Sequence, residues 1–82
     1  MGECPITLKQ LQPGETAIVE RMDIEGVMRR RLLDLGFIKG AKVTCVRKSP
    51  LGDPVAFQVS STVIALRESE SKHIIVRIAE EG

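Results

Sequence analysis

The chain contains no tryptophan and no tyrosine, and Phe37 and Phe57 are its only aromatic residues. Proteins that stack nucleic-acid bases or bind proline-rich peptides line the binding surface with aromatic side chains. Two phenylalanines are too few to build such a surface. The composition therefore argues against a base-stacking platform and against a proline-peptide groove.

An excess of charge of either sign is missing as well. Twelve basic and eleven acidic side chains leave a formal net charge of +1 among 82 residues. Dedicated nucleic-acid-binding domains usually carry a clear surplus of Lys and Arg, so we expect no nucleic-acid partner. Apolar residues make up 43% of the chain, enough for one small core. We expect a single domain spanning 1–82, with its core at about 6–78.

Long apolar runs are also absent, and cysteine is scarce. No run approaches the ~20 apolar residues that a membrane-spanning helix needs. The first ten residues, MGECPITLKQ, lack the apolar segment of a secretion signal. The two cysteines, Cys4 and Cys45, form no C-x-x-C motif. We therefore expect a cytoplasmic protein whose two thiols are free and not joined in a disulfide.

Glycine and proline divide the chain into short segments, one of which has helical periodicity. The segment predicts an α-helix at about 24–35, with Asp23 as its N-cap and Gly36 in the left-handed position that ends it. Upstream, Thr7 is a candidate cap for a short N-terminal helical turn that carries Leu8 and Leu11. On the helical wheel five apolar side chains share one arc that we expect to face the core: Ile24, Val27, Met28, Leu32 and Leu35.

The remaining segments alternate apolar and polar residues or are rich in β-branched residues, which predicts about five short strands. A sheet of this size hides its edges best by curling into a barrel. We therefore predict a mainly β fold, a small barrel with the helix lying across one open end. The strands are expected at 16–22, 41–48, 55–61, 62–70 and 72–82, with a hairpin turn at 60–62. The expected barrel interior consists of Val19, Val43, Phe57, Val59, Ile64, Leu66, Ile74, Val76 and Ile78.

No set of residues has the arrangement of a catalytic or metal centre. A hydrolase needs a nucleophile, a base and an orienting group within hydrogen-bond reach, and the single histidine, His73, is expected as a half-exposed strand residue. Acidic pairs at 68/70 and 80/81 fall in segments that we expect to be exposed. Cys4, Cys45 and His73 lack the ligand spacing of a zinc site. We expect no enzymatic activity and no cofactor, while a weak divalent-ion site built from exposed carboxylates stays open.

The segment RRRLLDLGFIKG, residues 29–40, carries the densest cluster of positive charge. On the helical wheel Arg29 points away from the apolar arc, and Arg30 lies beside an acidic residue one turn later. Arg31 falls inside the arc, so its stem should run along the core. The three arginines therefore do not form one patch. Leu33 projects opposite the arc and next to Arg29, which is a hint of a partner surface.

The loop SPLGDP at 49–54 combines two prolines with an apolar tip, a pre-organised shape that suits docking. We expect this loop to lie near the exposed helix face and to complete one contact surface for a protein partner. The residues predicted to make the contact are Arg29, Arg30, Leu33, Leu51 and Asp53.

Several of these segments occur together in an order that is familiar from a known family. They are Arg31-Leu32, Asp34-Leu35-Gly36, Lys39-Gly40, the loop 49–54, Ile64-Ala65-Leu66-Arg67 and Ile74-Ile75-Val76, preceded by an L..L.PGE.A.I pattern at 8–18. With this pattern the chain resembles the FeoA family, small cytosolic proteins of bacterial ferrous-iron transport, over about 6–78 of its length.

The resemblance implies an SH3-like small β-barrel, which agrees with the barrel predicted from periodicity. It also implies a non-catalytic cytosolic accessory protein of ferrous-iron uptake. Such a protein binds the cytoplasmic part of FeoB, a membrane transporter with a GTP-binding domain, and supports or regulates it. The expected location is the cytoplasm, at the inner face of the cell membrane when the partner is bound.

Two other functions stay open on the sequence. The same fold occurs as the C-terminal domain of iron-dependent repressors, so the resemblance also allows a metal-responsive regulatory domain. A nucleic-acid-binding small barrel is the second alternative. The charge balance and the missing aromatic residues weigh against it.

Overall fold

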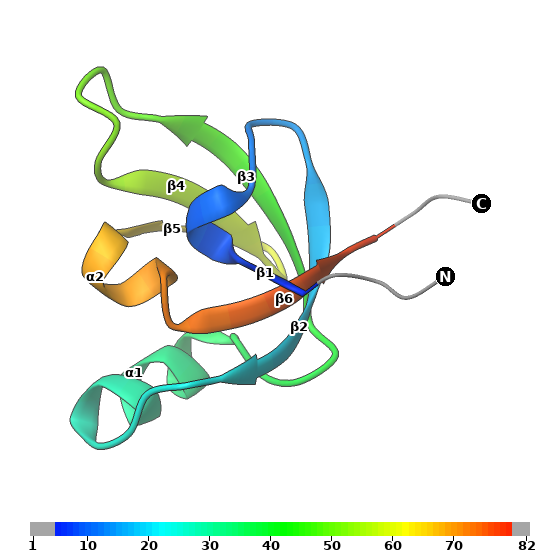
Figure 1. Ribbon diagram of the computed structural model, residues 1–82, viewed down its shortest axis with the longest axis vertical. Coiled ribbons are helices and arrows are strands. Elements are labelled where there is room, and N and C mark those ends of the chain that lie inside the picture. Colours follow the sequence, from blue (N-terminus) through cyan, green and yellow to red (C-terminus); the bar gives the residue numbers. More distant parts are fainter. Residues whose placement is uncertain (1–4, 80–82) are drawn as a thin grey trace.

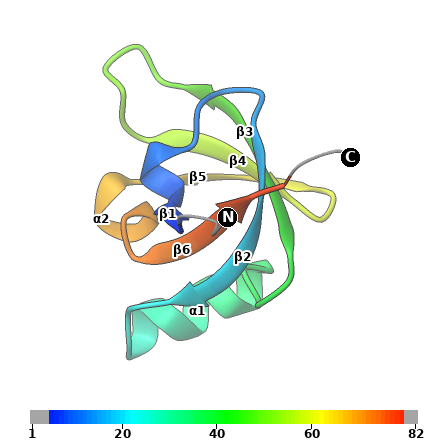
Figure 2. The same cartoon turned by 45° about the vertical axis from the view of Figure 1, so that its right-hand side comes forward.

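Six antiparallel strands form one sheet in a computed structural model that describes residues 5–79. The sheet order is β1-β6-β2-β3-β4-β5, and the sheet curls around its own interior (Figures 1 and 2). The predicted mainly β fold is therefore confirmed. The strands are β1 (Ile6–Thr7), β2 (Thr16–Met22), β3 (Lys42–Lys48), β4 (Val55–Val59), β5 (Thr62–Leu66) and β6 (Ile74–Ile78).

Three short helices accompany the sheet: η1 (Leu8–Gln10), α1 (Val27–Leu35) and α2 (Glu68–Ser71). The inserted helix α1 lies at one end of the curled sheet, between β2 and β3 in the chain (Figure 1). It begins three residues later than predicted, because Gly26 takes a positive φ of 84° and becomes the N-cap. Asp23 is not the cap, and its carboxylate instead accepts a hydrogen bond from Arg21 Nε at 3.1 Å.

The end of α1 confirms the predicted left-handed turn. Gly36 has φ 112° and ψ 3°, and its N–H donates to the Leu33 carbonyl at 3.0 Å. The next residue, Phe37, donates its N–H to the Leu32 carbonyl at 3.1 Å. These two bonds form a Schellman motif, which turns the chain back so that the Phe37 side chain is fully buried.

The core lies inside the curled sheet and under α1. Seven of the nine predicted interior residues are buried, whereas Ile64 is only partly buried and Ile78 is 39% exposed. Ile78 is the last residue of β6 and pairs with Ala17 near the start of β2. The helical arc was also partly wrong, because Val27 is 87% exposed in the first turn of α1, which extends beyond the sheet (Figure 1). The buried apolar residues are Leu8, Leu11, Ala17, Val19, Leu32, Phe37, Val43, Cys45, Val55, Phe57, Val59, Leu66, Ile74 and Val76.

Two elements were not predicted. The strand β1 has only two residues and pairs Ile6 with Val76 of β6. The helix α2 replaces the end of the strand predicted at 62–70, because Glu70 Oε1 accepts the N–H of Arg67 at 3.0 Å and caps a single helical turn. Glu70 is thereby 9% exposed, which corrects the expectation of an exposed carboxylate. The predictions for Cys4 and for the acidic pair 80/81 lie outside the described residues.

Candidate functional site

A groove between α1 and β2 contains two of the predicted contact residues, Arg29 and Leu33. Leu33 is half-buried and does not project freely from the helix, which corrects the outward position predicted from the helical wheel. The helical wheel placed Leu33 opposite the apolar arc. The strand β2 runs along that face of the helix, however, and partly covers the Leu33 side chain (Figure 1). Leu33 thus forms a wall of the groove.

The floor of this groove is apolar. Val19 of β2 and Phe37 of the helix-ending turn line it and are almost fully buried, and Met22 contributes a half-buried side chain. The volume of the groove is about 200 Å³. Small-molecule sites usually measure about 300–1,000 Å³, so the groove suits one or two apolar side chains of a protein partner better than a nucleotide.

Positive charge surrounds the apolar floor. Two charged residues of β2 in the lining are already paired, Arg21 with Asp23 at 3.1 Å and Glu20 with Arg77 at 2.6 Å. Arg29 and Lys39 are the remaining charged residues of the lining, and neither forms an ion pair within residues 5–79.

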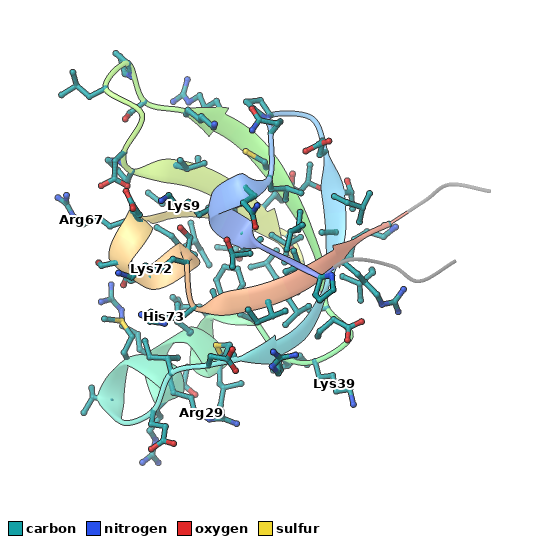
Figure 3. The ribbon with its side chains drawn as sticks, viewed as in Figure 1. Lys9, Arg29, Lys39, Arg67, Lys72 and His73 are labelled. Carbon is teal, nitrogen blue, oxygen red and sulfur yellow. The ribbon has the colours of Figure 1, made fainter. Side chains whose placement is uncertain are left out.

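Figure 3 shows Arg29 and Lys39 on the same side of the molecule, both pointing away from the barrel. The groove is therefore an apolar pocket with two free cations at its rim. In the sequence Lys39 follows the helix-ending Gly36 by three residues, which does not indicate that both it and Arg29 line one groove.

The other predicted contact residues lie elsewhere. Leu51 is 94% exposed in the loop between β3 and β4, and Figure 1 shows that loop at the opposite end of the barrel from α1. Asp53 of the same loop accepts the N–H of Glu68 at 2.8 Å and so holds the start of α2. Arg30 is exposed on α1 but does not line the groove. The five predicted residues therefore do not form one continuous surface.

The last arginine of the run faces α2. Arg31 Nη1 lies 3.9 Å from Glu70 Oε2, and the Arg31 side chain is 69% exposed. The stem of Arg31 is therefore not buried along the core, which corrects the prediction from the helical wheel. Arg29 and Arg30 are both exposed and form no ion pair within residues 5–79, so the predicted pairing of Arg30 with the acidic residue one turn later does not form.

Residues that could carry chemistry are dispersed. Within residues 5–79, no three His, Cys, Asp or Glu side chains are placed to hold a metal ion. Cys45 is a free thiol in the core, and burial raises its pKa, with Lys48 acting in the opposite direction. In the same part of the chain no helix is long and apolar enough to cross a bilayer.

Comparison with known proteins matches this sequence to the FeoA domain over residues 6–78. A fusion of Fe(2+) transport protein A with the Fe(2+) transporter FeoB from Porphyromonas gingivalis is 34% identical over 71 residues. The match covers 87% of this chain but only 8% of that protein.

Solved structures give the same result. The FeoA protein of Chlorobium tepidum is 37% identical with a TM-score of 0.85, and the match covers 94% of this chain and 75% of the other. A FeoA of Stenotrophomonas maltophilia is 41% identical with a TM-score of 0.77, over 87% of this chain and 88% of the other. It is described as an SH3 domain protein complexed with zinc, which confirms the predicted fold class.

A manganese-dependent transcriptional repressor also superimposes, with a TM-score of 0.83. At 16% identity this likeness concerns the fold alone. The family model covers nearly the whole chain, and the relatives at 34% to 41% identity carry the FeoA name. The chain therefore belongs to the FeoA family of ferrous-iron transport proteins.

Proposed function

We propose that this protein is a non-catalytic accessory of ferrous-iron uptake that binds the cytoplasmic part of a FeoB-type transporter. The observation that supports this proposal is the relative in which the FeoA part and FeoB form one polypeptide. Fusion holds two parts at a high effective concentration, about millimolar for short linkers, and so favours contact between them. The present chain, which matches that FeoA part, needs a surface that makes the same contact.

The groove between α1 and β2 is the surface that we assign to this contact. It offers an apolar floor for an anchoring side chain, walled by Leu33, and a rim with Arg29 and Lys39, which form no ion pair among the described residues. Interfaces of this kind combine a desolvated apolar centre with a charged rim, and the centre supplies most of the affinity. A partner segment with an apolar anchor and flanking carboxylates matches these features.

The loop between β3 and β4 is a second, separate contact in this proposal. Its tip residue Leu51 is almost fully exposed, and it lies too far around the barrel from α1 to belong to the same patch (Figure 1). A partner that reaches both surfaces has to extend over one side of the barrel. Leu51→Asp tests this contact independently of the groove.

The test is isothermal titration calorimetry with the soluble cytoplasmic part of a FeoB-type transporter from the same source. Leu33→Asp places a charge in the apolar groove and should weaken binding at least about 30-fold, the loss expected of an interface hot spot. Val27→Asp is the matched control, because Val27 lies on the same helix, is 87% exposed and does not line the groove. It should bind like the wild type.

A charge-reversed variant separates loss of contact from loss of folding, because Leu33 is partly buried. Arg29→Glu changes only an exposed side chain and should weaken binding about fivefold, with the loss shrinking as salt is added. Wild-type affinity in both Leu33→Asp and Arg29→Glu contradicts the assignment of the groove. Absence of binding by the wild-type protein contradicts the proposed function itself.

A further inference from the structure

The strand β5 forms one edge of the sheet and pairs with β4 alone. In an antiparallel pair, only alternate residues exchange hydrogen bonds with the neighbouring strand. The connection between β4 and β5 is a two-residue hairpin loop, and its closing pair is Val59 with Thr62. Closing pairs of such hairpins are hydrogen-bonded. The backbone N–H and C=O groups of Val63 and Ala65 therefore point away from β4.

Within residues 5–79, these outward groups have no other backbone partner. The side chains leave the edge accessible as well, because Val63 is 59% exposed and Ala65 is exposed. Sheet edges are commonly protected by proline, by lysine or by an inward-pointing charge. The β5 sequence TVIAL has none of these protections. The edge is thus open to pairing with another strand.

A hollow of about 460 Å³ lies beside this edge. Ala65 and Arg67 form one wall, and Met28 and Arg31 of α1 form the other. The only carboxylate in the lining is that of Glu70, which is nearly buried, accepts the Arg67 N–H and faces Arg31 at 3.9 Å. The hollow therefore has room for side chains next to the strand and carries net positive charge.

Positive charge continues on the other side of Ala65. A second hollow of about 570 Å³ is lined by Ala65 together with Arg47 and Lys48, and no carboxylate lines it. Arg47 forms no ion pair within residues 5–79. Cations thus lie near Ala65 both beside the open edge and, across β4, on the outer face of the sheet. An acidic strand complements this charge, whereas a second copy of this chain brings the same cations to the contact.

We propose that the β5 edge binds an extended, acidic segment of a partner protein, which adds to the sheet as a further strand. Main-chain hydrogen bonds at Val63 and Ala65 supply the pairing, and the surrounding arginines select for carboxylates. This surface lies apart from the groove between α1 and β2, shares no lining residue with it, and does not depend on the proposed contact there.

The experiment uses a synthetic peptide of alternating valine and glutamate as the probe, and a valine–lysine peptide of the same length as its control. Each is titrated into the isotope-labelled protein and followed by NMR. The glutamate peptide should shift the amide signals of β5 and slow hydrogen exchange at Val63 and Ala65 about tenfold or more. The lysine peptide should leave both unchanged.

Substitutions at one exposed position give a matched pair. Val63→Asp should weaken binding of the glutamate peptide about fivefold, and Val63→Lys should retain or strengthen it. Ala65→Pro removes one outward N–H and should abolish binding, with circular dichroism checking that the variant is folded. Arg29→Glu, at the other groove, should bind the peptide like the wild type. It thereby separates this proposal from the transporter contact.

Four outcomes overturn the proposal. They are equal binding of the two peptides, shifts outside β5 and its flanking hollows, equal affinity of the Val63→Asp and Val63→Lys variants, and dimerisation through β5. Dimerisation would appear as a concentration-dependent mass in light scattering that Ala65→Pro removes. That result assigns the edge to a second copy of the chain.

Discussion

Replacing Gly36 by alanine tests the turn that ends α1 and places Phe37 under the groove. Gly36 has φ 112°, a conformation that residues with a side chain rarely adopt. A Cβ at this position would lie 3.5 Å and 3.7 Å from the two methyl carbons of Val59. These distances are ordinary van der Waals contacts, so crowding adds little. The destabilisation of Gly36→Ala therefore comes from the backbone conformation.

The size of the stability loss in Gly36→Ala follows from two opposing effects on the free energy of unfolding. Holding alanine at a strained positive φ costs about 1–3 kcal/mol. The same substitution restricts the unfolded chain, which stabilises the protein by about 0.4–1 kcal/mol. The net loss in the free energy of unfolding should be about 1–2 kcal/mol, which lowers the melting temperature by about 4–16 °C in a domain of this size.

Thermal and urea unfolding followed by circular dichroism measure this loss. Gly36→Asn provides the control, because asparagine tolerates the left-handed region, and it should lose less stability than Gly36→Ala. Gly36→Val should lose more, because a β-branched residue fits positive φ worst. An unchanged or higher melting temperature in Gly36→Ala, or the reverse order of the three variants, refutes the reasoning.

Two further predictions concern ionisable groups. Lys9 Nζ lies 2.7 Å from Glu68 Oε2, and this hydrogen bond lowers the pKa of Glu68. The pair therefore stabilises the folded protein above the ordinary carboxyl pKa. This stabilisation is lost as the pH falls through the lowered pKa. Lys9→Met should raise the pKa of Glu68 in an NMR titration, and an unchanged value contradicts the assigned cause. The thiol of Cys45 is buried, and burial raises its pKa. In a Cys4→Ser variant, where Cys45 is the only thiol, the folded protein should therefore react with a thiol reagent on the order of 1,000-fold more slowly than the same variant unfolded in urea. Equal rates in the folded and unfolded protein contradict the burial of Cys45.

Elements fixed by local signals were predictable from the sequence. The strand β2 (Thr16–Met22) has the bounds that were predicted. A β-branched run lies there between the turn at Pro13-Gly14 and the polar start of the helix segment. The end of α1 was also predictable, since glycine followed by a large apolar residue is the signature of a Schellman motif. These features depend on neighbouring residues and not on the final packing.

Features that depend on packing were not predictable. Val27 and Leu33 lie on the helix where the wheel placed them, but their exposures are reversed, because β2 covers the Leu33 side and the first turn of α1 extends beyond the sheet (Figure 1). The wheel gives angles around a helix and not the position of the neighbouring strand. Glu70 is an exception, because its carboxylate caps α2 by accepting the N–H of Arg67 only three residues earlier, a local signal that the prediction missed.

The candidate site was only partly predictable for the same reason. Arg29 and Leu33 are one turn apart on a helix, so the sequence brings them together. Their association with Lys39 and with Met22 depends on how α1 lies against β2, which no local pattern encodes. The predicted association with Leu51 fails because the loop after β3 lies at the far end of the barrel (Figure 1).

The most direct test of the account is an NMR titration of the isotope-labelled protein with the soluble cytoplasmic part of a FeoB-type transporter. If the groove is the contact surface, we expect the largest amide shifts along it, at Arg29, Leu33, Phe37 and Lys39, and the loss of these shifts in Leu33→Asp. Absence of shifts, or shifts confined to the opposite face of the barrel, contradicts the account.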